Sequence, residues 1–115
     1  MIKTIKLGDE SKGYKEYPLR LSTGAFTIFE EKTGLDAFTA LSDGKILAKA
    51  RNMQALIYGG IKMGYLWNEE ECPLSFDQVG NLLDVRDMGR YISLALESMR
   101  VDEQVGEKKN MKKAV

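Results

Sequence analysis

The stretch Lys45 to Gly64, KILAKARNMQALIYGGIKMG, limits the possible folds more than any other part of the chain. Its apolar and small residues recur at steps of three and four, which places them on one stripe of an α-helix. Charged and amide side chains fall off this stripe. Because a helix with one apolar face needs partners to cover it, the stretch predicts a domain built around a central helix. The stripe consists of Ile46, Ala50, Met53, Ile57, Gly60, Ile61 and Gly64.

Two strands are predicted ahead of this helix, at Ile2 to Leu7 and Tyr14 to Leu21, where apolar and polar residues alternate. The polar, glycine-flanked sequence GDESKG between them indicates a hairpin. Pro18 has no backbone N–H, so the second strand is expected to have an open edge there. Such an edge could dock a partner, although a blunted hairpin end is the favoured interpretation.

A short helix is predicted between the hairpin and the central helix. Ser22 or Thr23 caps its start, and the spacing of Phe26 and Phe29 allows both rings to face the core. Gly34 ends it in the left-handed conformation that glycine adopts without strain.

A second helix, of about two turns, is predicted over residues 36–42. Leu35, Phe38 and Leu41 are spaced by three, so they are expected to share its apolar face. So short a helix is unstable alone and needs packing from the rest of the domain.

The most specific local signal is a capping box after the central helix. Ser75 and Gln78 can bond each other's backbone N–H groups, and Leu74 with Val79 can form the accompanying hydrophobic staple. A helix over residues 76–83 is therefore predicted. A last helix follows, capped by Asp84 and with apolar residues at Val85, Met88, Ile92, Ala95 or Leu96, and Met99.

Together these elements predict a mainly α protein with a small N-terminal β hairpin, an α+β fold in which four to five short helices surround the central one. A length of 115 residues allows one domain. We expect this domain to cover residues 1–100, with the hairpin in 1–21 and the helical bundle in 22–100. Residues 101–115 are polar and lysine-rich, which favours a flexible, solvated tail over a segment that contacts nucleic acid or an acidic partner.

Composition argues against several classes of function. Seventeen Lys and Arg balance seventeen Asp and Glu, whereas proteins that bind nucleic acid through its phosphates usually carry a basic excess. The chain has no histidine, which removes the commonest general base and zinc ligand. No window approaches the roughly eighteen apolar residues of a membrane span, and a single cysteine, Cys72, fits a reducing cytosol. We therefore expect no catalytic residues, metal, cofactor, nucleic acid or membrane.

Three features near the end of the central helix allow two interpretations each. Gly59 and Gly60 indicate either close packing of another helix or a contact surface for a partner backbone, and packing is favoured. Residues 65–71 are expected to form a loop, in which Trp67 is either a lid over the core or an exposed anchor for a partner; the lid is favoured. The glutamates at 69–71 suggest a metal site, but consecutive loop carboxylates are usually just solvated.

The order of three motifs resembles the tail assembly chaperones of long-tailed bacteriophages, prophages and phage-like gene transfer agents. In that pattern a helix with aromatic side chains ends in the sequence Glu-x-x-Thr-Gly. A second helix ends with an aliphatic residue, a bulky residue and a glycine, and a Ser- or Thr-capped helix then closes on aspartate. This chain has the three motifs at Phe29 to Gly34, Ile57 to Gly64 and Ser75 to Asp84, and the resemblance covers roughly residues 17–99.

The resemblance implies a protein without enzymatic activity in the host bacterial cytoplasm. Such proteins bind the tape measure protein, keep it soluble, recruit tail tube protein around it and are absent from the mature virion. Self-association would suit a protein that must bind a long rod many times. A helical domain with an apolar groove could cover the exposed apolar helices of a tape measure protein. Partner contacts are expected at the end of the central helix, at Tyr58, Gly59, Met63, Tyr65 and Trp67.

The alternative function is a small DNA-binding regulator. Short helices joined by tight turns over residues 75–99 could form a helix-turn-helix. The charge on the second of these helices is balanced, which is unfavourable for a recognition helix. Its charged residues are Arg86, Arg90 and Arg100 against Asp84, Asp87 and Glu97.

Overall fold

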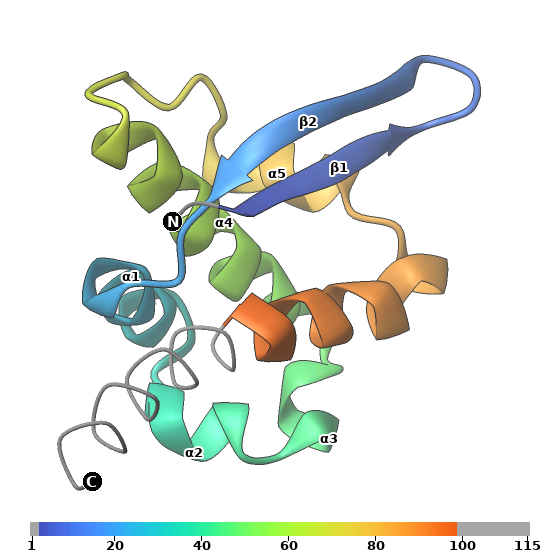
Figure 1. The fold of residues 1–115 in the computed structure, drawn as a ribbon. Helices are drawn as coiled ribbons and strands as arrows, with labels where there is room; N and C mark the ends of the chain where they lie inside the picture. Colours follow the sequence, from blue (N-terminus) through green and yellow to red (C-terminus); the bar gives the residue numbers. More distant parts are fainter. Residues whose placement is uncertain (1–2, 99–115) are drawn as a thin grey trace, which may run out of the picture.

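The computed structural model describes residues 3–98, and these form a mainly helical fold with a two-stranded N-terminal hairpin, as predicted (Figure 1). A final helix over residues 88–98 follows the last labelled element. The expected tail at 101–115 lies outside the described residues, as does Met99. The labelled elements are β1 (Lys3–Asp9), β2 (Gly13–Leu19), α1 (Thr23–Thr33), α2 (Ala37–Leu41), α3 (Gly44–Leu47), α4 (Ala50–Trp67), α5 (Phe76–Leu82) and the 3₁₀ turn η1 (Val85–Asp87).

The hairpin covers one side of α4 and contributes to the core. Its strands pair antiparallel, with Ile5 opposite Tyr17, and the apolar side chains of this face are buried, namely Ile5, Leu7, Tyr17 and Leu19. The turn is closed by the Asp9 carboxylate, which accepts hydrogen bonds at 2.8 Å from the Lys12 backbone N–H and from the Ser11 hydroxyl. The predicted hairpin is therefore confirmed, although the second strand ends at Leu19, before the predicted Leu21.

Glycines on the inner side of α4 allow α1 and β2 to approach its backbone closely. A Cβ atom added to Gly59 would lie 2.7 Å from the carbonyl oxygen of Ala25 in α1. One added to Gly64 would lie 2.8 Å from the backbone of Pro18 in β2. Gly60 faces the side chain of Leu19. Close packing, the favoured interpretation of the glycine pair, is confirmed.

The prediction of one continuous central helix over 45–64 is wrong at both ends. A short helix, α3, ends at Leu47, and Lys49 has an extended conformation (ψ 135°) that begins α4 anew. The buried Asn52 stabilises this break, because its side-chain amide donates a 2.8 Å hydrogen bond to the backbone carbonyl of Ile46. At the other end α4 continues to Trp67, where a loop was expected.

The apolar spacing in α2 does not mark its buried face. Phe38 is 71% exposed and Leu35 is also exposed, whereas Ala37, Ala40 and Leu41 are buried. In a helix of five residues the small alanines allow close packing on the core, and the Phe38 ring instead contacts the ring of Phe26 edge-on, with centroids 6.0 Å apart.

Both predicted caps after α4 are confirmed. The Ser75 hydroxyl accepts from the backbone N–H of Gln78, and the Gln78 side chain accepts from the backbone N–H of Ser75. Asp84 occupies the N-cap position of η1, and its carboxylate accepts from the backbone N–H of Arg86. These two caps fix where α5 and η1 begin.

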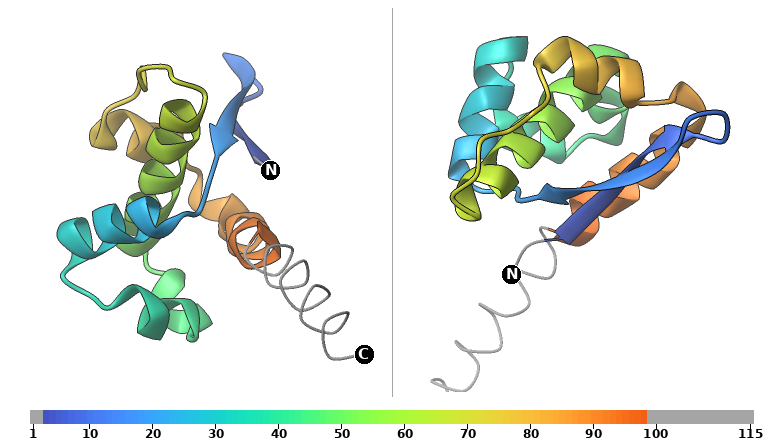
Figure 2. Two further views of the ribbon diagram at one scale, coloured as in Figure 1. Left: turned by 60° about the vertical axis from the view of Figure 1, so that its left-hand side comes forward. Right: turned by 90° about the horizontal axis from the view of Figure 1, so that it is seen from above.

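The predicted stripe of the last helix is confirmed in part, because Ala95 is buried and Met88 and Ile92 pack against the core. Tyr91 and Ala95 are fully buried, whereas Val85 is exposed. Val85 lies in the 3₁₀ turn, whose tighter winding rotates it away from the face used by the following helix. Arg90 from this helix donates a 3.1 Å hydrogen bond to the backbone carbonyl of Lys6, which places the helix beside β1 (Figure 2). No helix of the described part of the chain has the length and apolar character that would let it cross a membrane.

Candidate protein-binding surface

The residues predicted to contact a partner lie between the middle of α4 and its C-terminal end, but the helix directs them to different sides. Gly59 is buried against Ala25 of α1, so it packs the fold and presents no surface to another protein. The other four reach the surface to different extents and form two pairs, Met63 with Trp67 on one side of α4 and Tyr58 with Tyr65 on another.

Trp67 is exposed at the last turn of α4. Its side chain is 59% exposed, and the preceding Leu66 is 63% exposed. The guanidinium of Arg20 lies over the indole ring, 4.1 Å from the ring centroid, which is the geometry of a cation–π contact. The expectation of a lid over the core is wrong, because the extension of α4 carries Trp67 beyond the core to the connection between β2 and α1.

Met63 continues this surface along the helix. It precedes Trp67 by one helical turn, so the two side chains point the same way. The Met63 sulfur lies against Gly24 at the start of α1, where a Cβ atom would come within 2.5 Å of it. We name the set Arg20, Met63, Leu66 and Trp67 the Trp67 surface.

Tyr65 lies on another side of α4 and is partly buried. Burial raises the pKa of its phenol, with smaller contributions from Cys72 and Tyr17. Tyr65 therefore lies among the loop after α4 and the hairpin, and it does not join the Trp67 surface.

Tyr58 lies two turns before Tyr65 on the same side of α4, next to the start of α5. Its ring meets the ring of Phe76 edge to face, with centroids 5.5 Å apart. The ammonium groups of Lys32 and Lys62 lie 5.9 Å and 5.8 Å from the Tyr58 centroid. Tyr58 thus belongs to a separate, positively charged surface.

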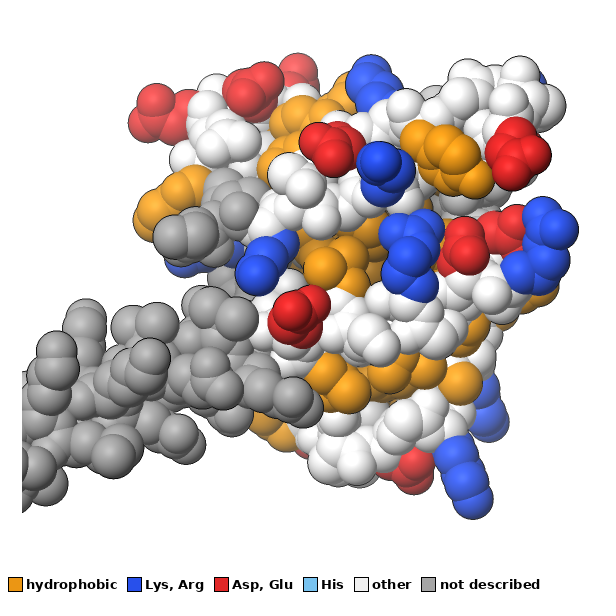
Figure 3. Space-filling model, turned by 45° about the vertical axis from the view of Figure 1, so that its right-hand side comes forward, with side chains coloured by type: hydrophobic (Ala, Val, Ile, Leu, Met, Phe, Trp, Pro, Cys, Tyr) orange, Lys and Arg blue, Asp and Glu red, His pale blue; other side chains and the backbone are white. Residues whose placement is uncertain are grey.

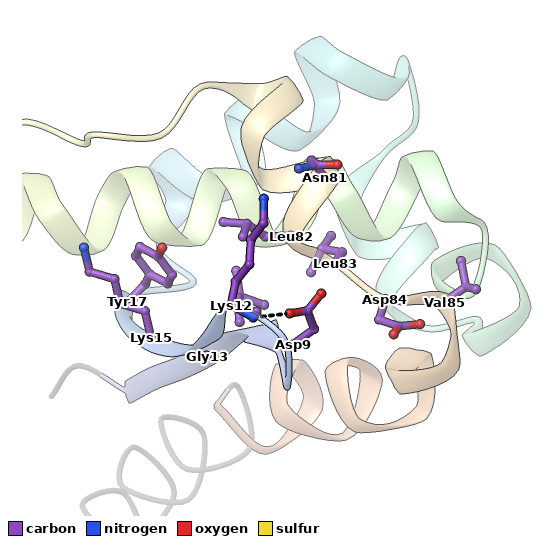
Figure 4. Close-up of a pocket in the computed structure, with 12 residues that line it drawn as sticks. Asp9, Lys12, Gly13, Lys15, Tyr17, Asn81, Leu82, Leu83, Asp84 and Val85 are labelled. Carbon is purple, nitrogen blue, oxygen red and sulfur yellow. Dashed lines mark hydrogen bonds between the residues drawn. The ribbon is translucent and has the colours of Figure 1, made fainter.

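A groove between the hairpin and α5 is a surface that the sequence did not suggest (Figure 4). It has a volume of about 670 Å³, with an apolar lining from Leu7, Leu82 and Leu83 and with Lys12 from the hairpin turn above it. At Tyr17 and its neighbours the groove adjoins a second hollow of about 410 Å³ along α5.

Figure 3 shows apolar side chains gathered in hollows on the side of the molecule nearest the hairpin turn, with Lys and Arg side chains around them. The two walls of the groove are more than sixty residues apart in the chain, so spacing could not reveal it. The one available signal is the pair Leu82 and Leu83, because adjacent residues of a helix end cannot both point to the same core.

The described residues offer no metal centre, since no group of three or more His, Cys, Asp or Glu is placed to hold an ion. Asp84 is an ionised N-cap: hydrogen bonds from Arg86 lower the pKa of its carboxyl to about 2. Asp77 lies in the first turn of α5, where a negative charge favours the helix. Both carboxylates therefore have structural roles.

Comparisons of this chain with protein-family models, with curated proteins and with solved structures give no match.

Proposed function

We propose that this protein is a tail assembly chaperone, which binds a tape measure protein in the host bacterial cytoplasm, recruits tail tube subunits and leaves before the virion is complete. The proposal joins the resemblance in motif order to one observation, the Trp67 surface. There a tryptophan and a leucine are held in solvent at the end of a helix, where the fold does not need them.

The composition of the Trp67 surface suits protein binding. Trp and Arg are the residue types most enriched at the energetic centres of interfaces, and here Arg20 covers the ring of Trp67. Exposed apolar side chains of this size are costly for a monomer to keep, because they promote aggregation. A long helical partner that exposes apolar residues before the tail tube encloses it is the kind of protein that could cover them.

A chaperone that connects two partners needs two separate surfaces. The groove between the hairpin and α5 is the second one available, and its lining does not include the residues of the Trp67 surface. We assign the tape measure protein to the Trp67 surface and the tube subunit to this groove.

The DNA-binding alternative has less support. In the expected recognition region, Arg86 pairs with Asp84 at 2.7 Å and Arg90 pairs with Asp87 at 3.4 Å. Arg90 also donates to the backbone of β1. Within the described residues, these contacts engage both arginines of that region, which would otherwise be available to bind phosphates or bases.

Co-expression tests the proposal. The neighbouring gene for a very long helical protein is expressed with an affinity tag, alone and together with this chain. We expect the tagged protein to be soluble only in the presence of this chain and to retain it on purification. The double variant L66S/W67A should lose both effects, while F38A, which removes an exposed aromatic from α2, should keep them.

Two results would reject the proposal. One is the absence of a tape-measure-like gene and a tube gene beside this one. The other is equal retention of the wild-type chain and L66S/W67A by the tape measure protein.

A further inference from the structure

Three basic side chains surround two aromatic rings on the side of the molecule that carries Tyr58. Lys32 lies over both rings, 4.9 Å from the centroid of Phe76 and 5.9 Å from that of Tyr58. Arg51 is 5.9 Å from the Phe76 centroid, and Lys62 is 5.8 Å from the Tyr58 centroid. We name this set Lys32, Arg51, Tyr58, Lys62 and Phe76 the basic aromatic surface.

Three helices hold the surface in place. Arg51, Tyr58 and Lys62 follow one another along the solvent side of α4, at spacings that keep them on one face. The Arg51 guanidinium donates to the backbone carbonyl of Lys32, at 3.0 Å and 3.3 Å, and so joins the end of α1 to α4.

The third helix is attached through a side-chain amide of α4. Gln54 donates a 3.0 Å hydrogen bond to the backbone carbonyl of Phe76, the first residue of α5. The two rings and the three cations are therefore presented by packed helices, and none of them comes from a loop.

The positive charge of this surface is not neutralised within the described part of the chain. The ion pairs found among residues 3–98 are Arg86 with Asp84 and Arg90 with Asp87. The exposed cations Lys32, Arg51 and Lys62 thus have no carboxylate within 4.0 Å there. The rings attract these cations through their quadrupoles but cancel none of their charge.

We infer that the basic aromatic surface binds an acidic segment of another protein, one in which carboxylates alternate with apolar side chains. Three cations can each meet a carboxylate, and the exposed parts of the Tyr58 and Phe76 side chains can contact apolar side chains that lie between those carboxylates. This interface is separate from the Trp67 surface, and the inference holds whether or not the partner of that surface is a tape measure protein.

A nucleic acid fits the same surface less well. Single-stranded nucleic acid needs ring faces on which its bases can stack. Here the two rings are packed edge to face against each other, and cations lie over them. The chain as a whole also has no net positive charge to attract a polyanion.

Peptide binding tests this inference on the full chain. The probe is a fluorescein-labelled 20-residue peptide in which glutamates alternate with leucines, and its binding is followed by fluorescence anisotropy. We expect it to bind with an affinity that falls as salt rises, because salt screens exposed charges. The same peptide with lysine in place of glutamate should not bind.

The variant K32E/K62E should weaken binding of the glutamate peptide by about tenfold or more, because two attractive contacts become repulsive. Neither side chain makes a hydrogen bond in the structure to residues 3–98, so folding should be preserved; the milder variant K32A/K62A repeats the test if it is not. K6E/K45E, the same charge change on exposed lysines elsewhere, should bind within about twofold of the wild type.

Three outcomes would overturn the inference: equal binding of the glutamate and lysine peptides, an unchanged affinity of the folded K32E/K62E or K32A/K62A variant, or tighter binding of a 20-nucleotide single strand than of the glutamate peptide. L66S/W67A should bind the glutamate peptide normally. A failure of the chaperone proposal and a failure of this inference are therefore distinguishable.

Discussion

The inner side of α4 and its C-terminal end differ in how strongly packing restricts the size of their side chains, although they belong to one helix. On the inner side, Gly59, Gly60 and Gly64 occupy positions where a Cβ atom would collide with α1 or β2. At the end, Leu66 and Trp67 project into solvent. The fold dictates the residue size in the first region and leaves it open in the second. A large apolar side chain where packing does not require one is a reason to look for a partner.

The largest expected effect on stability comes from a substitution that disrupts the close packing on the inner side of α4. Gly59→Val places a branched side chain against the backbone of Ala25, and we expect it to lower the free energy of unfolding by about 3 kcal/mol or more. Gly44→Ala is the matched control, because no atom outside its immediate neighbours lies within 4 Å of the added Cβ. It should be neutral or slightly stabilising. Urea unfolding measures both, and similar stabilities would contradict the role given to the inner side.

The opposite result is expected at the C-terminal end. Trp67→Ala removes one exposed cation–π contact and should lower the free energy of unfolding by less than about 1 kcal/mol. Its effect on binding of the tape measure protein should be larger, about 2 kcal/mol or roughly thirtyfold in affinity. Urea unfolding and titration with the purified partner measure the two quantities. A loss of stability that matches the loss of binding would show that Trp67 is structural after all.

Helix caps allow a smaller test of which local signals the fold uses. Ser75→Ala removes the hydroxyl of the capping box and should cost about 1 kcal/mol of stability. Ser22 occupies the same position in α1 without a side-chain hydrogen bond, so Ser22→Ala should cost clearly less. Thermal or urea unfolding compares the two variants. An equal cost for both would mean that the hydrogen bond of Ser75 is not the source of the stabilisation.

The smallest expected effect is on stability at low pH, and it concerns Asp84, which lies outside α4. The pKa of Asp84 is about 2 in the folded protein, below the ordinary value of 3.8, because of its hydrogen bonds with Arg86. Its contribution to stability is therefore complete above about pH 4 and lost as the pH falls towards 2. Asp84→Asn cannot ionise, so its unfolding midpoint in urea should fall less between pH 4 and pH 2 than that of the wild type. Identical pH dependence would remove Asp84 from the groups responsible.

Elements whose signals lie within a few neighbouring residues were predictable. Gly34 ends α1 in the left-handed conformation, with φ at 74°, because the signal and its effect are one residue apart. The helix break at Lys49 was not predictable, because the hydrogen bond from Asn52 to Ile46 that stabilises it requires a buried Asn52, whereas the periodicity assigned this residue to the polar side. Of the five residues predicted to contact a partner, the structure brings Met63 and Trp67 together on one surface, whereas Arg20, which adjoins Trp67 there, comes from a distant segment.

The sequence by itself determined the hairpin and the caps of α5 and η1, because the hydrogen bonds of turns and caps are local. It also predicted a crowded glycine stretch in the central helix. Only the tertiary structure decided which apolar residues were left outside. Burial depends on how much room the neighbouring elements leave, so Phe38 and Trp67 project into solvent while the small Gly59 is enclosed. The close packing of α1 and β2 against the glycines of α4 leaves the C-terminal end of that helix uncovered.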